Sequence, residues 1–422
     1  MILTKMRQPK TFNIIFITFL ICSLILTNKI HTANTSGTIY IHADGLIDPH
    51  DAPISTIDNI TYTCTSDIYE PIIVEKSAIT IDGNGFKLQG TGSGTGLYLT
   101  TTTNIIVQNM KITQFRVGVY ASSAVNITLT NNTIIGPSHP PDWNGNGIHL
   151  EGQGNNAINE NYISHNQRGV FIYGPGGNNK ISNNIFMTNL HAILLGSQCD
   201  NNTINDNLFT NNTDGIHLDM SQNNLIKNNI IIGNIGSGIY LDPVGNGYNT
   251  IHDNNITNNG HGIFSALPYR GNNMIINNFI ASSTRVGIRL DNSQGNKIYH
   301  NDLVNNTKQV TVSSVANFWD NDIEGNYWSN YTDVDSNHDG IGDSPYIINA
   351  YNQDNYPLMN PYIPGDYNHD ATVNIADAEM VRTAWQSIKG EPNYNPHTDF
   401  NMDGIFSIKD ATIIGINWQK HA

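Results

Sequence analysis

Oxygen-bearing side chains recur at alternate positions in two segments of the C-terminal part of the sequence. In the first segment they occupy positions 1, 3, 5, 7, 9 and 12 of a loop, namely Asp366, Asn368, Asp370, Thr372, Asn374 and Asp377. The same order returns 33 residues later as Asp399, Asn401, Asp403, Ile405, Ser407 and Asp410. Position 7 offers its backbone carbonyl, so its side chain is free to vary. Oxygen ligands in this order are typical of a loop that surrounds a calcium ion, and we expect both segments to bind Ca²⁺.

A third acidic segment has a related spacing. Its candidate ligands are Asp335, Asn337, Asp339 and Asp343. Gly340 occupies the position at which such loops turn sharply, and the first loop has Ala371 at the matching position. Glycine adopts left-handed backbone angles without steric cost. We therefore expect a calcium turn in this third segment and a weakened site in the loop that contains Ala371.

Acids and aromatic residues in the middle of the chain point to a different chemistry. Asp219 and Asp242, with His217, could supply a general acid and a general base for cleavage of a glycosidic bond, so these three are candidate catalytic residues. Aromatic rings stack on sugar faces, and the candidates for sugar binding are Tyr240, Phe171, Tyr173, Arg289 and Asp291. Acids and histidines are also ordinary on any exposed strand. Binding without catalysis, and exposure without any ligand, therefore stay open.

These residues lie within a repeat whose period predicts how they are positioned. The pattern Asn-x-Ile-x-x-Asn-x-Ile/Phe advances by 22 to 25 residues and starts at Asn156, Asn179, Asn202, Asn224, Asn249 and Asn273, with a weaker copy at Asn296. A second pattern, Gly-Ile-x-Leu or a close variant, keeps step and starts at Gly147, Gly169, Gly215, Gly238 and Gly287. Short alternating apolar runs without helical periodicity predict a parallel β-solenoid with one coil per repeat.

The repeat also predicts which side chains share a face. Alternate side chains of a strand point to opposite faces, so the repeated Ile should stack inside the solenoid. The repeated Asn should form hydrogen-bonded ladders at the turns, and the repeated Gly should permit a sharp corner. The outward position x then holds His217 and Tyr240, and the outward position after Leu places Asp219 and Asp242 next to them, one coil apart.

The Asn/Gly/Ile coil, with the segment 79–88 that leads into it, resembles the parallel β-helix repeats of the NosD type. The resemblance extends from Gly37 to Trp328. It implies an all-β fold, a right-handed single-stranded parallel β-helix over residues 37–330. It implies no particular activity, because this scaffold hosts lyases, hydrolases, adhesins and metallochaperone-associated proteins. The copper role in the family's name needs grouped Met, His or Cys ligands. The 15 histidines are scattered along the sequence, so copper is not carried over.

Each C-terminal loop runs into a short amphipathic stretch that predicts a helix, at 378–385 and at 411–418. A duplicated loop and helix over residues 364–420 resembles a type I dockerin with paired EF-hand loops, closed here by Asp. This resemblance implies a small α-helical calcium module with a cohesin-like partner. Dockerins of cellulose-degrading complexes carry a hydroxyl pair at loop positions 10 and 11, where this chain has Ile375-Ala376 and Ile408-Lys409. Cohesin specificity is therefore not carried over, and calcium as a folding staple without a partner is the alternative.

Between these two domains, residues 331–362 are expected to cap the solenoid. The last coil of a solenoid exposes strand edges that would otherwise pair with another chain. Four aromatic residues gather where the repeat ends, namely Trp319, Tyr327, Trp328 and Tyr331. The third acidic segment follows them. We expect these aromatics and the calcium turn to form part of the cap.

The N-terminal segment predicts export. Lys5, Arg7 and Lys10 precede an apolar run over 12–26, as in a secretory signal. We expect residues 1–33 to be a signal peptide or, if uncleaved, an N-terminal anchor, because the apolar run is shorter than the ~20 residues that span a membrane. The sequence has 20 Lys and Arg against 35 Asp and Glu, a formal net charge of −15. This acidic balance excludes the basic surface that nucleic-acid binding requires.

These features predict an exported, calcium-dependent β-helix protein, secreted or at the cell surface. It would bind polysaccharide or the glycans of a glycoprotein, and its dockerin-like module would serve attachment or assembly. One alternative is a polysaccharide hydrolase or lyase that uses Asp219, Asp242 and His217, although no segment reproduces a pectate-lyase or polygalacturonase signature. The second alternative is a structural component of a surface layer.

Overall fold

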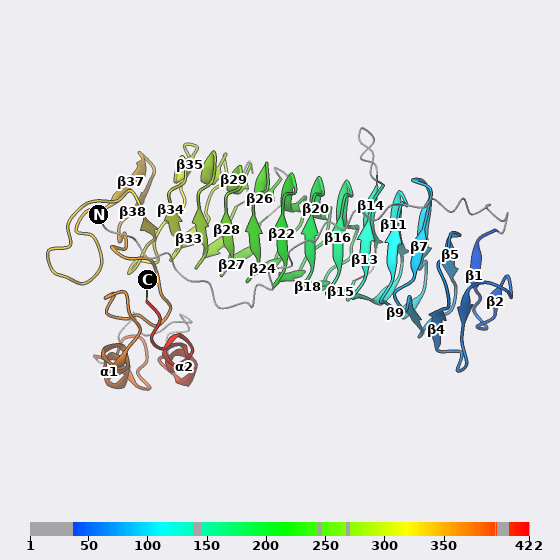
Figure 1. The fold of residues 1–422 in the computed structure, drawn as a ribbon. Helices are drawn as coiled ribbons and strands as arrows, with labels where there is room; N and C mark the ends of the chain where they lie inside the picture. Colours follow the sequence, from blue (N-terminus) through cyan, green and yellow to red (C-terminus); the bar gives the residue numbers. More distant parts are fainter. Residues whose placement is uncertain are drawn as a thin grey trace, which may run out of the picture. The chain divides into compact units, whose positions relative to one another are not determined.

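The computed structural model describes residues 37–137, 145–152, 154–242, 247–266, 271–392, 394 and 405–421. They fall into two compact units, Thr38–Tyr362 and a second unit that begins at Ile363. The first unit is the solenoid, and the second holds two short helices (Figure 1). The predicted signal segment 1–33 lies outside the described residues, as do the predicted ligands Asp399, Asn401 and Asp403.

Three long sheets run along the solenoid. In the described part of the chain the first sheet has 13 strands, paired in the order β2 (Ile47–Asp48), β1 (Ile39–Ile41), β5 (Ile72–Val74), β8 (Thr95–Tyr98), β11 (Val117–Ser122), β14 (Asn146–Glu151), β17 (Arg168–Tyr173), β20 (His191–Leu195), β23 (Asp214–Leu218), β26 (Ser237–Leu241), β29 (His261–Ser265), β32 (Val286–Leu290) and β35 (Val310–Val312).

The other two sheets also run along the solenoid and take one strand from each coil. Over the same described ranges the second sheet has 12 strands, in the order β3 (Ile54–Ser55), β4 (Thr61–Cys64), β6 (Thr80–Asp82), β9 (Thr103–Gln108), β12 (Val125–Thr130), β15 (Ala157–Asn159), β18 (Lys180–Ser182), β21 (Thr203–Asn205), β24 (Leu225–Lys227), β27 (Thr250–His252), β30 (Met274–Ile276) and β33 (Lys297–Tyr299). The third, again counting described residues, has 11 strands, in the order β36 (Tyr327–Trp328), β34 (Asp302–Val304), β31 (Phe279–Ala281), β28 (Asn255–Thr257), β25 (Ile230–Ile232), β22 (Leu208–Thr210), β19 (Ile185–Met187), β16 (Tyr162–Ser164), β13 (Thr133–Ile135), β10 (Lys111–Thr113) and β7 (Lys87–Gln89).

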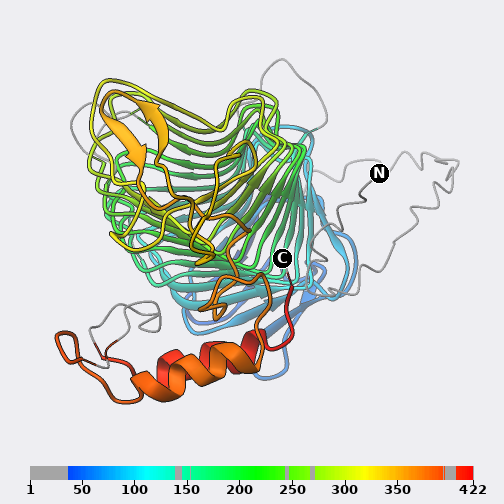
Figure 2. The ribbon, with the colours of Figure 1, turned by 90° about the vertical axis from the view of Figure 1, so that its left-hand side faces the viewer.

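From β5 to β32 each strand pairs in parallel with the strand three further along the chain, so three short strands make one coil. Seen along the solenoid, successive coils lie nearly on top of one another (Figure 2). The predicted parallel β-helix is therefore confirmed. Antiparallel pairs at its start join β1 to β2 and β3 to β4.

The core is a set of stacked apolar columns. One column, paired in register along the first sheet and fully buried, consists of Ile148, Val170, Ile193, Ile216, Ile239, Ile263 and Ile288. Phe186 and Phe209 stack in the third sheet with ring centroids 5.0 Å apart. Because every coil repeats the same inward residues, each apolar side chain packs on its counterpart in the next coil.

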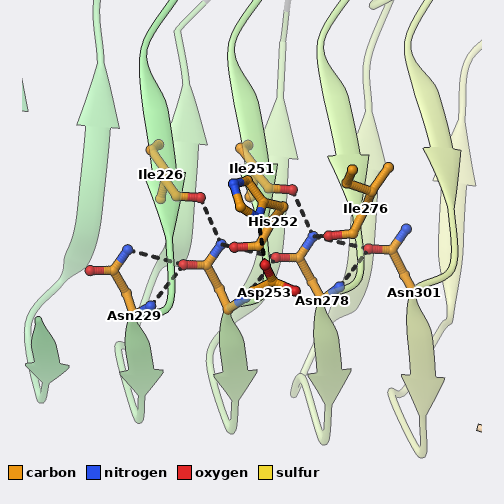
Figure 3. A network of polar contacts seen from close by, with 9 residues as sticks. Ile226, Asn229, Ile251, His252, Asp253, Ile276, Asn278 and Asn301 are labelled. Carbon is orange, nitrogen blue, oxygen red and sulfur yellow. Dashed lines mark hydrogen bonds and ion pairs between the residues drawn. The ribbon is translucent and has the colours of Figure 1, made fainter. Parts of the chain in front are cut away.

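Buried asparagines form the predicted ladders (Figure 3). Asn254 Oδ1 accepts hydrogen bonds from the backbone N–H and from Nδ2 of Asn229, each at 3.0 Å. Asn229 Nδ2 also donates to the carbonyl of Ile204 at 2.9 Å. The ladder continues through Asn278 to Asn301. Each amide thus satisfies backbone groups that the turn removes from the strand pairing.

The repeated Gly has a different role from the predicted one. Gly215 and Gly238 do not have left-handed backbone angles. A Cβ added at Gly215 would lie 2.5 Å from the carbonyl oxygen of Gly238 in the next coil. Left-handed angles occur instead at the residue before each ladder Asn, such as Asn228 (φ 54°) and Asp253 (φ 56°). The prediction of a corner glycine was wrong: Gly lets the coils approach closely, and Asn and Asp, which tolerate this conformation, make the corners.

An antiparallel hairpin, β37 (Tyr346–Asn349) and β38 (Asn352–Asp354), lies at the end of the solenoid. Trp319 and Trp328 are fully buried there, and Tyr346 stacks on Trp328 with ring centroids 4.1 Å apart. The carboxylate of Asp354 accepts hydrogen bonds from Trp328 Nε1 at 2.8 Å and from the backbone N–H of Asn326 at 2.7 Å. Burial raises the pKa of Asp354 to about 7.

The second unit contains α1 (Ile375–Ala384) and α2 (Ile408–Asn417). Both helices begin three residues before the predicted starts at 378 and 411, because Asn374 and Ser407 form capping boxes with Asp377 and Asp410. Their core comprises Ile363, Tyr367, Val373, Val381, Ala384, Phe406 and Ile414. Among the residues that the structure describes, no helix has the length and apolar character needed to cross a membrane.

Candidate functional site

The outward side chains of the first sheet form a continuous row, which we call the aromatic column. In register from coil to coil it consists of Tyr98, Tyr120, His149, Phe171, Leu194, His217, Tyr240, Phe264 and Arg289. Neighbouring rings touch, with centroids 4.8 Å apart for His149 and Phe171 and 5.1 Å apart for Tyr240 and Phe264. The predicted outward column is thus present, and the parallel register keeps its rings in contact.

The predicted catalytic residues lie together beside this column. Asp219 and Asp242 follow β23 and β26, and the Nε2 atom of His217 is 3.1 Å from a carboxylate oxygen of Asp242. Burial raises the pKa of Asp219, and the charge of Asp242 raises it further. Burial lowers the pKa of His217, and the neighbouring His191 lowers it further, while Asp242 acts in the opposite direction. The arrangement sets the carboxyl groups of Asp219 and Asp242 near one imidazole.

The predicted sugar-binding residues extend along the same face. Burial raises the pKa of Tyr240, whose ring lies 4.7 Å from that of His217. Tyr173 is 48% exposed and packs against Phe171 at 5.9 Å. Arg289 lies over Phe264 at 4.6 Å and donates to Asp291 from both Nε and an NH₂ group. The face therefore offers rings and charges, and part of its charge is already paired.

Two residues near this face were missed. His191 and Asp214 open β20 and β23, at the position before the repeated small residue, and the register pairs them. His191 Nδ1 lies 3.2 Å from Asp214 Oδ2 and 3.4 Å from His217 Nδ1. The expectation that the histidines are too scattered for grouping fails here, because the coil period brings residues 26 apart into contact. The signal in the sequence is the position before the repeated small residue, which holds His191 in one coil and Asp214 in the next.

The first predicted calcium loop curls around its own carboxylates. Asp366 accepts hydrogen bonds from the backbone N–H of Asp370 at 3.2 Å and from that of Ala371 at 2.9 Å. Asp377 accepts from the N–H of Tyr367 at 2.8 Å. Burial raises the pKa of Asp366 to about 6, and the charges of Asp377 and Asp370 also raise it. The loop thus gathers acids whose mutual repulsion a bound cation would offset. In the second loop only Ile405, Ser407 and Asp410 are described.

The third acidic segment has the same local geometry. Asp335 accepts from the backbone N–H of Asp339 at 3.2 Å and from that of Gly340 at 2.9 Å, as Asp366 does from the matching positions. Asn337 donates to Asp339, and Asp343 accepts from the N–H of Ser336 at 3.1 Å. The backbone angle φ is +79° at Gly340 and +69° at the matching Ala371. Both loops therefore share the same backbone hydrogen bonds and the same turn.

Comparison with known proteins identifies the two parts of the chain. Residues 21–198 and 191–333 match the family model described as periplasmic copper-binding protein (NosD). The chain belongs to the NosD family. Residues 364–415 match the model of the dockerin type I domain. A probable ABC transporter binding protein NosD of Stutzerimonas stutzeri is 43% identical over 79 residues. That match spans 18% of this chain and 18% of the relative.

Two solved structures are similar to this chain. A double mutant of the periplasmic alginate epimerase AlgG matches with a TM-score of 0.51 and 18% identity, over 65% of this chain and 72% of that one. The A-module of the mannuronan C-5 epimerase AlgE4 of Azotobacter vinelandii matches with a TM-score of 0.41 and 14% identity, over 66% of this chain and 87% of that module. At this identity the first likeness shows a β-helix and carries no statement about activity.

The family description raises the question of whether the described residues fit copper. Cys64 and Cys199 are buried free thiols, and burial raises the pKa of each to about 12, so neither offers a thiolate. The imidazoles of His191 and His217, with the carboxylate of Asp214, are ligands that suit a divalent ion such as copper(II). The donor set therefore fits the divalent ion and lacks the soft sulfur ligands that favour copper(I).

Proposed function

We propose that this chain is an exported β-helix protein that binds polysaccharide or glycoprotein glycans along its first sheet. The observation that carries the proposal is the aromatic column, with its row of half-buried rings in constant register. Strands of neighbouring coils lie about 4.8 Å apart, so the column presents rings at successive coils on either side of Leu194, from Tyr98 to Phe171 and from His217 to Phe264. A regular row of rings flanked by carboxylates suits an extended polymer of sugars better than a compact small molecule.

The C-terminal unit would attach the protein to a partner. Its match to the dockerin type I domain and its duplicated loop–helix pattern support a calcium-dependent module with a cohesin-like partner. Ile375 and Ile408 open the two helices at the positions where cohesin specificity usually lies, and they are 63% and 67% exposed. Two exposed apolar side chains at equivalent positions suit an apolar contact surface on that partner.

A second candidate function is cleavage of the bound polysaccharide. The observation that favours it is the pair Asp219 and Asp242, because burial and a neighbouring charge raise the pKa of Asp219. A carboxyl group with a raised pKa can act as an acid while its neighbour stays ionised. In this arrangement Asp219 would be the acid, and Asp242, which pairs with His217, the base.

The two functions are separated by one pair of assays on the calcium-loaded protein. A glycan array measures binding, and assays for reducing ends and unsaturated products measure turnover. Phe171→Ala and Tyr240→Ala should weaken glycan binding, whereas Phe279→Ala, an outward ring of the third sheet, should not. Asp219→Ala with Asp242→Ala should abolish any turnover, with Glu160→Ala as the matched acid control.

Each outcome decides between the hypotheses. Binding that weakens in both ring variants, without products, supports a glycan-binding protein. Products that disappear in the double Asp variant support an enzyme. If the protein shows neither glycan binding nor products, both proposals are refuted and a structural surface component remains.

A further inference from the structure

A cluster of His191, Asp214 and His217 lies on two neighbouring strands of the first sheet, at β20 and β23. Metal ions are commonly bound by His, Cys, Asp and Glu side chains. In the described part of the chain this is the one group of at least three such residues in which one ligand atom from each lies within 4.8 Å of the others. The exposed fractions are 22% for the His191 side chain, 15% for Asp214 and 11% for His217. The cluster is thus shielded yet reachable from solvent.

The distances within the cluster match those between ligands of one metal ion. Two ligand atoms at about 2.1 Å from an ion in tetrahedral geometry are about 3.4 Å apart. His191 Nδ1 and His217 Nδ1 are 3.4 Å apart, and His191 Nδ1 is 3.2 Å from Asp214 Oδ2. Both separations therefore lie within about 0.2 Å of the edge of a tetrahedral site. The parallel register of β20 and β23 holds the three residues in place without a loop.

The other nitrogen of His217 has the partner that a metal ligand usually has. Nε2 lies 3.1 Å from a carboxylate oxygen of Asp242, so Nε2–H can donate while Nδ1 keeps its lone pair for an ion. Histidines that bind metals commonly donate their second N–H to a carboxylate, which fixes the tautomer and the ring orientation. The ring of Tyr240, 4.7 Å away, packs against His217 and restricts its rotation.

We propose that His191, Asp214 and His217 bind a divalent transition-metal ion, with Asp242 as the positioning residue for His217. Two imidazoles and one carboxylate favour Zn²⁺ or Cu²⁺ over Ca²⁺, which prefers oxygen ligands alone. The charges also agree, because Asp214 and Asp242 together balance a doubly charged ion. Three protein ligands leave one position for water or for a group of a bound molecule.

The test uses the full chain with excess Ca²⁺, so that the acidic loops are occupied before the transition metal is added. Titration calorimetry with Zn²⁺ should show one strong equivalent. The electron paramagnetic resonance spectrum of the Cu²⁺ complex should show coupling to two imidazole nitrogens. His191→Gln and Asp214→Asn should abolish the strong equivalent, and Asp242→Asn should weaken binding by about 10- to 100-fold.

The matched control is His252→Gln. His252 lies on the second sheet and also pairs with an acid, Asp253, at 2.6 Å, but belongs to no such cluster among the described residues. This variant should bind Zn²⁺ as the wild type does. Circular dichroism without metal checks that each variant is folded, and His191→Asn replaces His191→Gln if the latter is not. No strong equivalent in the wild type, or equal affinity in the His191 and His252 variants, would overturn the proposal.

Discussion

Ala371 is held in a backbone conformation that favours glycine, and replacing it should stabilise the second unit. Its φ is +69°, and its N–H donates to Asp366, which fixes the loop in this geometry. A side chain in the left-handed region costs about 1–2 kcal/mol. Replacement by glycine removes this cost, but it also lowers the stability by about 0.4–1 kcal/mol because glycine gives the unfolded chain more conformational freedom. Ala371→Gly should therefore stabilise the unit by about 0.5–1 kcal/mol.

The assay is chemical denaturation of the calcium-loaded chain, followed by the helical circular dichroism signal. This signal reports on the second unit, because α1 and α2 are the α-helices among the described residues. The matched control is Ala378→Gly, an alanine inside α1, which should destabilise the unit by about 1 kcal/mol. The two substitutions remove the same methyl group at different backbone angles, and at Ala378 that methyl group also packs against the core of the second unit. If Ala371→Gly lowers the midpoint as Ala378→Gly does, the argument from backbone strain is wrong.

Three further predictions concern the ladder, the end of the solenoid and the calcium loops. Asn229→Ala should cost about 2–4 kcal/mol in a denaturation experiment, because it removes the acceptor of the buried backbone N–H of Asn207 and the side-chain donor to the Ile204 carbonyl, whereas Asn228→Gly in the exposed turn should be nearly neutral. The pKa of Asp354 is about 7 in the folded state and about 3.9 in the unfolded state. Between these two pH values Asp354 is protonated when the chain is folded and ionised when it is unfolded. Stability should therefore fall as the pH rises from about 4 to 7, by up to about 1.4 kcal/mol per unit, and unfolding midpoints of Asp354→Asn should lack this component. Chelation of calcium should lower the unfolding midpoint of the helical signal and, because the third acidic segment belongs to the expected cap, the midpoint of the solenoid's strand signal as well.

The solenoid was predictable because two short periods determine most of it. A strand alternates its side chains, and the coil repeats every 22 to 25 residues, so the outward row from His149 to Arg289 follows from counting. Counting failed at the first residues of these strands. His191 and Asp214 lie beside the close contact between coils, where alternation does not determine direction. The role of the repeated Gly was missed for the same reason, since the contact between coils is a property of the stacked backbones.

In the second unit the loops were predictable, but the starts of the helices were not. The spacing of oxygen ligands predicted the loops, because a cation requires those atoms in that order. The helix starts were placed too late because Asp377 and Asp410 were interpreted as ligands alone. In the structure each also completes a capping box, so loop and helix share a residue. Ile375 and Ile408, apolar and exposed, therefore belong to helices rather than to loops.

The asparagine ladder has a direction, and this direction bears on assembly. Every rung donates from its Nδ2 to the oxygen of the next rung, as from Asn278 to Asn301 and from Asn301 to Asn326. Asn326 then donates its backbone N–H to Asp354, a fully buried acid that takes the place of a further amide. The last donor of the row is thus already bonded inside the molecule. A second molecule placed end to end would find no free rung there to extend the row, so the buried acid disfavours fibre growth.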